Sequence, residues 1–256
     1  MISSKDNAKI KAVARLVTSA KARRDSGMFV LEGTRLSAEA LGDNIRICEM
    51  YYTNNVAASN PTLISNLRAR ANFETEVSES VFEKISDTCS PQGVLLVVQF
   101  KAPVSVPDNG RFLAFEMVQD PSNLGAAART AEALGFAGII LSKNGADPYS
   151  PKSLRASMGA LLRLPIIYSD DFLATLEGFK LKGFNINGTV VDANATKINT
   201  VSFSQNEATV IGNEANGMTD AAKSVCDRLL TIPMAGRAES LNAAAAAAIV
   251  MWEMCR

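Results

Sequence analysis

The chain has 256 residues, of which 47% are hydrophobic, and its 26 basic and 26 acidic side chains leave no net charge at pH 7. This length suits one large domain or two modest ones, with enough apolar residues for buried cores. The sequence contains no histidine, which excludes Ser-His-Asp and Cys-His catalysis and nearly all histidine-ligated metals.

The first hundred residues predict a small α/β domain. Residues 1–24 place Ile10, Val13 and Val17 on one side of a helix. Further elements are expected in this order: a strand at 28–31, a helix at 35–41, a strand at 46–53, a helix around 61–71 and a strand at 94–100. Strands and helices alternate, as they do in α/β folds.

Positive charge is concentrated in residues 1–24, which carry seven basic side chains against the single acidic residue Asp6. Such a patch predicts a surface for the phosphates of a nucleic acid, with a solvated helix face as the alternative. The candidate RNA-binding residues in this segment are Lys9, Lys11, Arg23 and Arg24.

A linker is expected at residues 103–110, where Pro103, Pro107 and Asn109-Gly110 interrupt any regular pattern. We therefore assign residues 1–102 to an N-terminal domain and 111–256 to a second domain. The alternation restarts in the second domain. Strands are expected at 112–118, 138–141, 184–191, 209–211 and 229–232, and helices at 124–134, 151–158, 220–226 and 240–254. This pattern predicts a mainly parallel sheet covered by helices.

Four cysteines are far apart in the sequence and form no Cys-x-x-Cys pair: Cys48, Cys89, Cys226 and Cys255. We expect reduced thiols in a cytoplasmic protein, with no zinc or redox site. The N-terminus has no apolar stretch long enough for a signal sequence, and the longest apolar run, 243–252, is too short to span a membrane.

Three glycine- and asparagine-bearing segments follow predicted strands of the second domain. The first, 121–129, reads Pro-Ser-Asn-Leu-Gly-Ala-Ala-Ala-Arg; the second, 212–217, reads Gly-Asn-Glu-Ala-Asn-Gly; and the third, 232–242, contains Ile-Pro-Met-Ala-Gly and ends in Ser-Leu-Asn. Loops at the strand ends of an α/β sheet build ligand sites from such residues. A matched set of three is far more specific than any one segment.

The set resembles the three motifs of the SpoU (TrmH-like) branch of the SPOUT RNA methyltransferases. The matching residues are Pro121, Asn123, Gly125 and Arg129 in the first motif, Gly212, Glu214 and Gly217 in the second, and 232–242 in the third. Residues 29–36 and 86–93 resemble stretches of the substrate-binding domain that precedes the catalytic domain in these enzymes. The resemblance covers nearly the whole chain and implies a deep trefoil knot in the C-terminal domain, an exception to unknotted topology.

The resemblance implies S-adenosylmethionine as the cofactor, and the residues suit that ligand. No Gly-x-Gly-x-x-Gly turn follows a strand here, so a dinucleotide pyrophosphate lacks its cradle. S-adenosylmethionine has no phosphate and needs apolar walls and backbone hydrogen bonds. The expected cofactor-binding residues are Gly212, Asn213, Glu214, Gly217, Ile232, Met234, Gly236, Ser240, Leu241 and Asn242. Neither the cofactor nor the reaction calls for a metal.

Arg129 is the leading catalytic residue implied by the resemblance, through deprotonation of a ribose 2′-hydroxyl. Because a guanidinium has a pKa above ~12 and is a poor base, Arg129 has a second possible role. It could orient a substrate phosphate and stabilise the developing alkoxide. The sequence leaves both roles open.

The other catalytic residues implied by the resemblance are Asn123, Glu214, Ser240 and Asn242. Glu214 is expected to accept hydrogen bonds from Asn123 or Arg129. Asn123 and Ser240 are also placed as N-caps of the helices that follow them, which is an alternative structural role.

Residues 150–160 are rich in serine and carry Lys152 and Arg155, which suits phosphate contacts. Lys152, Arg155 and Arg35 complete the candidate RNA-binding set, with a salt bridge inside its own domain as the alternative for Arg155. The resemblance implies a homodimer.

The leading hypothesis is methyl transfer from S-adenosylmethionine to a ribose 2′-oxygen of structured RNA, with 23S ribosomal RNA favoured and transfer RNA as the alternative. A non-catalytic RNA-binding or ribosome-assembly protein on the same scaffold is a second hypothesis, which the complete motifs disfavour. A doubly wound nucleotide-binding enzyme of another type is a third, and it lacks the phosphate turn.

Overall fold

The computed structural model describes residues 1–42, 45–100 and 106–256. They form two compact units, one of residues 1–102 together with 149–162, and one of residues 103–148 together with 163–256. The segment 149–162 thus folds with the N-terminal residues, although it lies far along the chain. Part of the expected linker, residues 103–105, lies outside the described residues.

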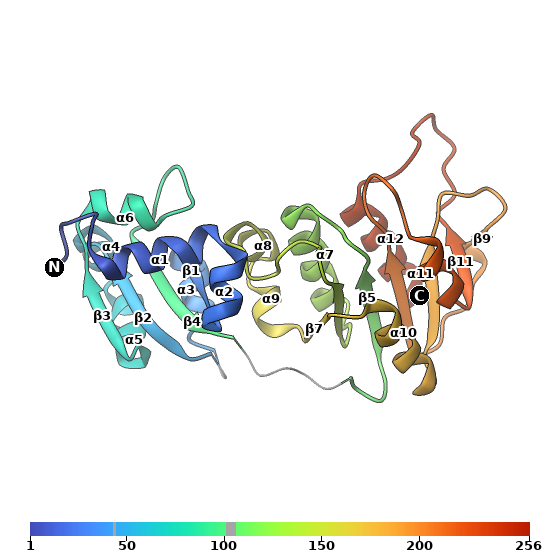
Figure 1. Ribbon diagram of the computed structural model, residues 1–256, viewed down its shortest axis with the longest axis horizontal. Helices are drawn as coiled ribbons and strands as arrows, with labels where there is room; N and C mark the ends of the chain where they lie inside the picture. The colour runs from blue at the N-terminus through green and yellow to red at the C-terminus, as the bar shows by residue number, and fades with distance from the viewer. Residues whose placement is uncertain (43–44, 101–105) are drawn as a thin grey trace. The chain divides into compact units, whose positions relative to one another are not determined.

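The first unit is built on a four-stranded sheet in the order β1-β4-β2-β3, in which only β2 and β3 are parallel. Its strands are β1 (Met28–Glu32), β2 (Ile47–Tyr52), β3 (Phe73–Glu76) and β4 (Val94–Gln99). Its helices are α1 (Ala8–Thr18), α2 (Ala20–Ser26), α3 (Thr34–Glu39), α4 (Asn54–Ser59), α5 (Pro61–Arg70), α6 (Glu79–Ile85) and α8 (Pro151–Ser157), the last followed by α9 (Ala160–Arg163). Helices α1 and α6 lie side by side in Figure 1 and pack against each other.

The expected apolar face of the first helix is confirmed, because Ile10, Val13 and Val17 are all buried in the core of this unit. The helical stretch is divided at Ser19, whose backbone is extended and whose hydroxyl accepts the N–H of Ala22 at 3.1 Å. Serine is a favoured N-cap residue, so α2 begins as a separate helix.

The segment 149–162 is anchored by an aromatic cluster. The ring of Tyr149 stacks on Phe100 at a centroid distance of 4.4 Å and lies 4.8 Å from Phe29. Such pairs contribute about 0.5–1.5 kcal/mol beyond the area that they bury. Helix α8 also packs on β1, so the segment is an integral part of this unit.

The second unit contains seven parallel strands in the order β7-β6-β5-β10-β8-β11-β9. They are β5 (Arg111–Phe115), β6 (Gly138–Ser142), β7 (Ile166–Ser169), β8 (Asn185–Thr189), β9 (Thr196–Lys197), β10 (Glu207–Ile211) and β11 (Arg228–Thr231). The helices are α7 (Pro121–Ala133), α10 (Phe172–Leu181), α11 (Asp220–Val225) and α12 (Ala243–Cys255), with a 3₁₀ turn at Ile198–Thr200. The parallel α/β expectation is confirmed.

Helices cover both faces of this sheet. Ala208 and Val210 of β10 join a core that includes residues of α10 and α11. Between them, the Thr209 hydroxyl contacts Met254 of α12 at 3.2 Å. Because successive side chains of a strand point to opposite faces, α12 lies on the face away from α10 and α11. Helix α7 packs beside α12, as Figure 1 also shows.

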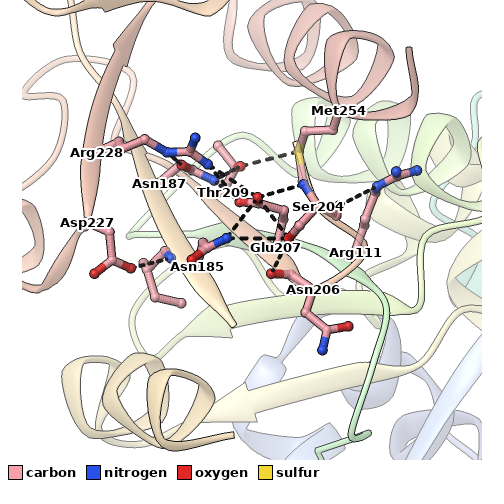
Figure 2. Close-up of polar contacts among 11 residues, drawn as sticks. Arg111, Asn185, Asn187, Ser204, Asn206, Glu207, Thr209, Asp227, Arg228 and Met254 are labelled. Carbon is pink, nitrogen blue, oxygen red and sulfur yellow. Dashed lines mark hydrogen bonds and ion pairs between the residues drawn. The ribbon is translucent and has the colours of Figure 1, made fainter. Parts of the chain in front are cut away.

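A buried carboxylate ties together three strands at their amino ends (Figure 2). Glu207 of β10 is fully buried and accepts bonds from Asn187 of β8 at 2.7 Å and from Arg228 of β11 at 3.2 Å. Asn185 and the backbone N–H of Ser204 also donate to it, at 3.1 and 2.9 Å. These strands are not consecutive in the chain, so the polar cluster fixes the register of β8 between β10 and β11.

Within the described residues, no helix is both long and apolar enough to cross a membrane. The same residues contain no group of three or more cysteine, aspartate and glutamate side chains that could hold a metal ion.

Candidate active site

A cavity of about 640 Å³ opens at the carboxyl ends of β8, β10 and β11. In parallel α/β sheets, ligands bind at this edge, and small-molecule sites measure about 300–1,000 Å³. Its lining residues come from the ends of these strands and from the second and third motifs: Thr189, Val190, Val191, Asp192, Ile211, Gly212, Asn213, Glu214, Ala215, Asn216, Gly217, Met218, Lys223, Leu229, Thr231, Ile232, Met234, Glu239, Ser240, Leu241, Ala243 and Ala246.

The second motif forms a closed turn beside the cavity. Asn213 and Gly217 exchange backbone hydrogen bonds at 3.0 and 2.9 Å, and Gly217 has a positive φ of 67°. A Cβ at Gly212 would lie only 2.3 Å from the backbone of Gly217 and Met218. Both glycines are therefore required by the fold of this turn, which explains why the motif begins and ends in glycine.

The turn is fixed to the end of β5. The Asn213 side-chain amide donates to the carbonyl of Met117 at 2.8 Å, while its oxygen accepts the N–H groups of Ala215 and Asn216 at 3.0 and 3.1 Å. Met117 has a positive φ of 54°, which is uncommon for a residue with a Cβ. Asn213 thus links the second motif to the strand that leads into the first.

Hydrogen bonds between side chains connect all three motifs. Asn123 of α7 donates to Glu214 at 3.0 Å and accepts from the amide of Asn242 at 2.9 Å. Glu214 also accepts the backbone N–H groups of Gln119 and Asp120, at 3.0 and 3.2 Å. The expected bond from Asn123 to Glu214 is present, and we call Asn123, Glu214 and Asn242 the motif network.

Glu214 is held in its ionised form. Partial burial raises the pKa of its carboxyl, but the bonds from Gln119, Asn123 and Asp120 outweigh burial and hold that pKa below its ordinary value. At neutral pH Glu214 is therefore a hydrogen-bond acceptor and not an acid, and it orients the Asn123 amide.

Two expected helix caps are wrong. Helix α7 is capped by Asp120, which accepts the N–H of Ser122 at 2.9 Å, and Pro121 takes its first position, where no N–H is needed. Helix α12 begins at Ala243 and is capped by Asn242, not by Ser240. Asn242 accepts from Ala244 and Ala245 at 2.9 and 3.3 Å.

Arg129 stands apart from the motif network. It lies six residues after Asn123 on α7, about 9 Å along the helix and a third of a turn around it. Its side chain is exposed, and within the described part of the chain it makes no bond to Glu214. The expected bond between Arg129 and Glu214 is absent, and Arg129 does not line the cavity.

Eight of the ten expected cofactor-binding residues line the cavity, and the remaining two, Gly236 and Asn242, do not. Gly236 is exposed, and a Cβ there would meet no atom within 4 Å. One wall was missed by the motif-based prediction, namely Thr189, Val190, Val191 and Asp192 at the end of β8. In the sequence, this wall is indicated only by Asp192, a polar residue that directly follows the predicted strand 184–191.

The lining has a composition that suits a cationic ligand with apolar parts. It includes Asp192, Glu214 and Glu239 against one basic residue, Lys223, which is itself paired with Asp220 at 2.9 Å. This balance repels phosphates and attracts a sulfonium or ammonium group. Val190, Ile211, Ile232, Met234 and Leu241 supply apolar surface. S-adenosylmethionine therefore fits the residues of the site, which lie on loops of one rigid sheet edge.

Of the candidate RNA-binding residues of the first unit, Lys9, Lys11 and Arg24 are exposed, and Lys11 pairs with Asp6 at 2.9 Å. Arg23 differs, because it is buried at 4% exposure and its guanidinium donates to the carbonyls of Leu16 and Val17 at 2.6 and 3.0 Å. Arg23 thus satisfies the last turn of α1 and does not belong to the exposed patch.

Lys152 is exposed and Arg35 is exposed. Arg155 is partly exposed and forms an ion pair with Asp87 at 2.6 Å. The salt bridge that was the alternative for Arg155 is thus present, and it lies within the first unit. This ion pair does not engage the whole guanidinium, since the second terminal nitrogen, Nη1, has no hydrogen-bond partner.

The fold and the cavity define a parallel α/β domain whose site, at the carboxyl ends of its strands, suits a positively charged ligand with apolar parts. The model of the SpoU rRNA Methylase family matches residues 110–252, and that of the MRM3-like substrate binding domain matches residues 7–96. The chain belongs to the SpoU rRNA methylase family, within the SPOUT methyltransferases, and its cofactor is S-adenosylmethionine.

Relatives match over the whole length. An uncharacterized tRNA/rRNA methyltransferase of Synechocystis is 33% identical over 100% of this chain and 93% of its own. The 23S rRNA (guanosine(2553)-2′-O)-methyltransferase RlmP of Bacillus subtilis is 29% identical over 99% and 98%. The SpoU methyltransferase AviRb of Streptomyces viridochromogenes, solved with AdoMet, superposes with a TM-score of 0.86 at 26% identity, covering 97% of each chain.

Proposed function

We propose that the protein transfers the methyl group of S-adenosylmethionine to a ribose 2′-oxygen of ribosomal RNA, with 23S RNA as the favoured substrate. The observation that carries this proposal is the motif network, which joins three distant segments beside an acidic, apolar-walled cavity. The relative from Bacillus subtilis is named as a 23S rRNA 2′-O-methyltransferase. The unit of residues 1–102 and 149–162 would hold the RNA.

In this reaction the ribose 2′-oxygen would form a bond to the methyl carbon as the carbon–sulfur bond breaks with its electrons remaining on sulfur, and the hydroxyl proton would pass to solvent water. The cofactor supplies an activated methyl group when bound. Asp192, Glu214 and Glu239 would stabilise its positive charge in the cavity. Asn123 and Asn242, held by Glu214, would position the neighbouring loops.

Arg129 would act on the substrate and not on the cofactor, since it lies outside the cavity lining. We assign it the role of holding a phosphate and stabilising the developing alkoxide, because a guanidinium remains protonated in proteins. The sequence also leaves open that Arg129 deprotonates the ribose 2′-hydroxyl. In that case the rate of methyl transfer would depend differently on pH. The proposed substrate also implies a cytoplasmic protein, and the resemblance implies a trefoil knot and a homodimer.

The test is a transcriptome-wide map of ribose methylation in cells with and without the protein. We expect one position of ribosomal RNA to lose its 2′-O-methyl group and to regain it when the purified protein and S-adenosylmethionine are added to the extracted RNA. Loss of a methyl group at a transfer RNA position would show that the substrate is transfer RNA and not ribosomal RNA. Unchanged maps would contradict the proposed reaction.

A further inference from the structure

A second cavity lies wholly within the first unit, at the end of the sheet where β1 finishes and β4 begins. It has a volume of about 260 Å³ and is lined by Glu32, Gly33, Arg35, Leu36, Thr88, Ser90, Gln92, Arg155 and Met158. Three stretches far apart in the chain therefore converge on it: 32–36, 88–92 and 155–158. Two of them lie in the segments that resemble the substrate-binding domain, and the third belongs to α8 and its C-cap.

The loops around this cavity are fixed by side-chain hydrogen bonds. The Glu32 carboxylate accepts the hydroxyls of Ser86 and Thr88 and the N–H of Asp87, the last two at 2.8 and 2.9 Å. The Gln92 side-chain oxygen accepts the N–H and the hydroxyl of Thr34 at 2.8 and 3.0 Å. A preorganised cavity of this kind loses little conformational entropy when a ligand binds.

Glycine is required at one position of this rim. Gly33 has a positive φ of 93°, and a Cβ there would lie 2.9 Å from the Gln92 side-chain oxygen. The backbone of Gly33 and the amide of Gln92 are therefore closely packed, and both residues line the cavity.

Unused hydrogen-bonding capacity remains in the cavity. One terminal nitrogen of Arg155 donates to Asp87 at 2.6 Å, while the other, Nη1, is buried and has no hydrogen-bond partner. An unsatisfied buried donor costs free energy that an acceptor on a ligand would recover. Arg35 is exposed at the rim and has no ion pair within the described residues. Arg35 is thus available to a ligand, and Arg155 contributes to the wall of the cavity.

The charges and surfaces of the cavity favour a nucleobase over a bare anion. The positive charges of Arg35 and Arg155 are opposed by Glu32, which lines the cavity, and by Asp87, which holds Arg155. Leu36 and Met158 supply apolar surface, and Gln92, Thr88 and Ser90 supply donors and acceptors. Proteins bind unstacked RNA bases through this combination of apolar contact, guanidinium planes and edge hydrogen bonds.

We propose that this cavity receives one unpaired nucleobase of the RNA substrate, as an anchor separate from the nucleotide that is methylated, with Arg35 contacting the adjoining phosphate. The proposal rests on the proposed RNA methyltransferase function. It adds a site to the first unit, built by Glu32, Gln92, Arg155 and Met158, that discriminates single-stranded from fully paired RNA.

The direct test uses methyl NMR of protein labelled at its nine methionines. Met158 lines the proposed base site, whereas Met218 and Met234 line the cofactor cavity, so one spectrum separates the two sites. Millimolar 5′-nucleoside monophosphates should shift the Met158 methyl signal, and S-adenosylmethionine should shift those of Met218 and Met234. Ribose 5-phosphate and inorganic phosphate should leave Met158 unchanged. Equal shifts with ribose 5-phosphate, or none with any nucleotide, would overturn the proposal.

A blocking variant tests the same site without removing a hydrogen bond. Ser90 is exposed at the cavity, so Ser90→Phe should fill it and abolish the nucleotide-dependent shift of Met158. With extracted ribosomal RNA, Ser90→Phe should raise the KM for RNA about tenfold, the scale of losing one stacked base. Arg35→Ala should also raise this KM, because it removes the phosphate contact, and both variants should keep their affinity for S-adenosylmethionine. Arg46→Ala is the matched control, because Arg46 bonds to Gln99 at the opposite end of the sheet.

The kinetic and NMR experiments together separate the proposed base site from the proposed methyltransferase function. If the wild-type protein methylates RNA and both variants keep its KM, the base site is refuted while the proposed function stands. If no RNA accepts a methyl group but Met158 responds to nucleotides and not to ribose 5-phosphate, the proposed function fails and base binding is supported.

Discussion

Arg129 is exposed and lies outside both the cavity lining and the motif network. Its contribution is therefore expected in the transition state and not in cofactor binding. Arg129→Ala should leave the affinity for S-adenosylmethionine nearly unchanged and slow methyl transfer by ~10² or more, the usual scale for losing one preorganised donor. Arg129→Lys should restore little, because an ammonium lacks the planar two-pronged contact.

Single-turnover assays at saturating RNA would separate chemistry from binding. Arg111→Ala serves as the control, since Arg111 begins β5 at the amino end of the sheet, away from the cavity. Transfer at a near wild-type rate by Arg129→Ala would show that Arg129 is only a surface residue of α7.

Asn242 has two functions that one substitution can separate. Its oxygen caps α12, and its amide nitrogen donates to Asn123. Asn242→Asp keeps a good N-cap, but it replaces the amide donor by an oxygen that repels the side-chain oxygen of Asn123. Asn242→Ala loses both the donor and the cap, and loss of the cap costs about 1 kcal/mol of stability. We expect both variants to lose methyl transfer, and only Asn242→Ala to lower the melting temperature. Normal transfer by Asn242→Asp would contradict a role for the motif network.

At the scale of helices, the adjacent residues Arg23 and Arg24 are a matched pair with opposite expected effects. Arg23 is buried against the last carbonyls of α1, and Arg24 is exposed. Arg23→Met should lower the free energy of unfolding by about 1–3 kcal/mol, because it leaves buried carbonyls without a partner. Arg24→Glu should leave stability nearly unchanged but weaken RNA binding and flatten its salt dependence. Thermal melts and salt titrations measure the two effects, and equal behaviour of both variants would refute the assignment.

The sheet of the second unit depends on the cluster around Glu207. Arg228→Met would leave a fully buried carboxylate without its cationic partner, which typically costs about 3–5 kcal/mol. The double change Glu207→Gln with Arg228→Met removes that charge as well and should be more stable at neutral pH than Arg228→Met alone. Denaturant titration of the wild type, the two single variants and the double variant gives the four free energies of unfolding of a double-mutant cycle. A double variant that is no more stable would show that the charge is not the cause.

The sequence predicted the elements and loops that carry strong local signals. The glycines of the second motif are fixed by the close packing at Gly212, so a pattern could reveal them. The wall at 189–192 has no such local requirement and was missed. The N-caps differ from the predicted Asn123 and Ser240 because other cap-forming side chains lie close by in the sequence. Asp120 caps α7 and Asn242 caps α12. Strand order was not predictable, since periodicity reports burial and not the neighbour of β8.

The membership of 149–162 in the first unit was also beyond the sequence. Its serine- and arginine-rich composition indicated an RNA contact, but the packing of Tyr149 on Phe29 and Phe100 joins residues more than 45 positions apart. Such non-local contacts leave no periodic signal in the chain. The same segment brings Arg155 to the second cavity, where it lies with Arg35, another of the candidate RNA-binding residues.

For the whole molecule, the open question with the largest consequence is the proposed homodimer. Helix α12 exposes two large apolar side chains, Ile249 at 38% and Trp252 at 61%, and it packs on α7, which carries Arg129. Aromatic and aliphatic side chains exposed together on one helix are typical of protein–protein interfaces. We expect a second copy of the chain there, with a total interface above ~1,000 Å².

Trp252 is the sole tryptophan of the sequence, so its fluorescence reports this surface directly. In a dimer its emission should be blue-shifted and poorly quenched by acrylamide, and dilution should reverse both effects. Ile249→Asp should give a monomer in sedimentation with red-shifted emission, because a carboxylate cannot be buried there without a partner. Leu181→Asp is the control, since Leu181 is 91% exposed at the end of α10, on the other face of the sheet. A wild-type monomer at all concentrations, or an Ile249→Asp protein that sediments as the wild type does, would exclude assembly through α12.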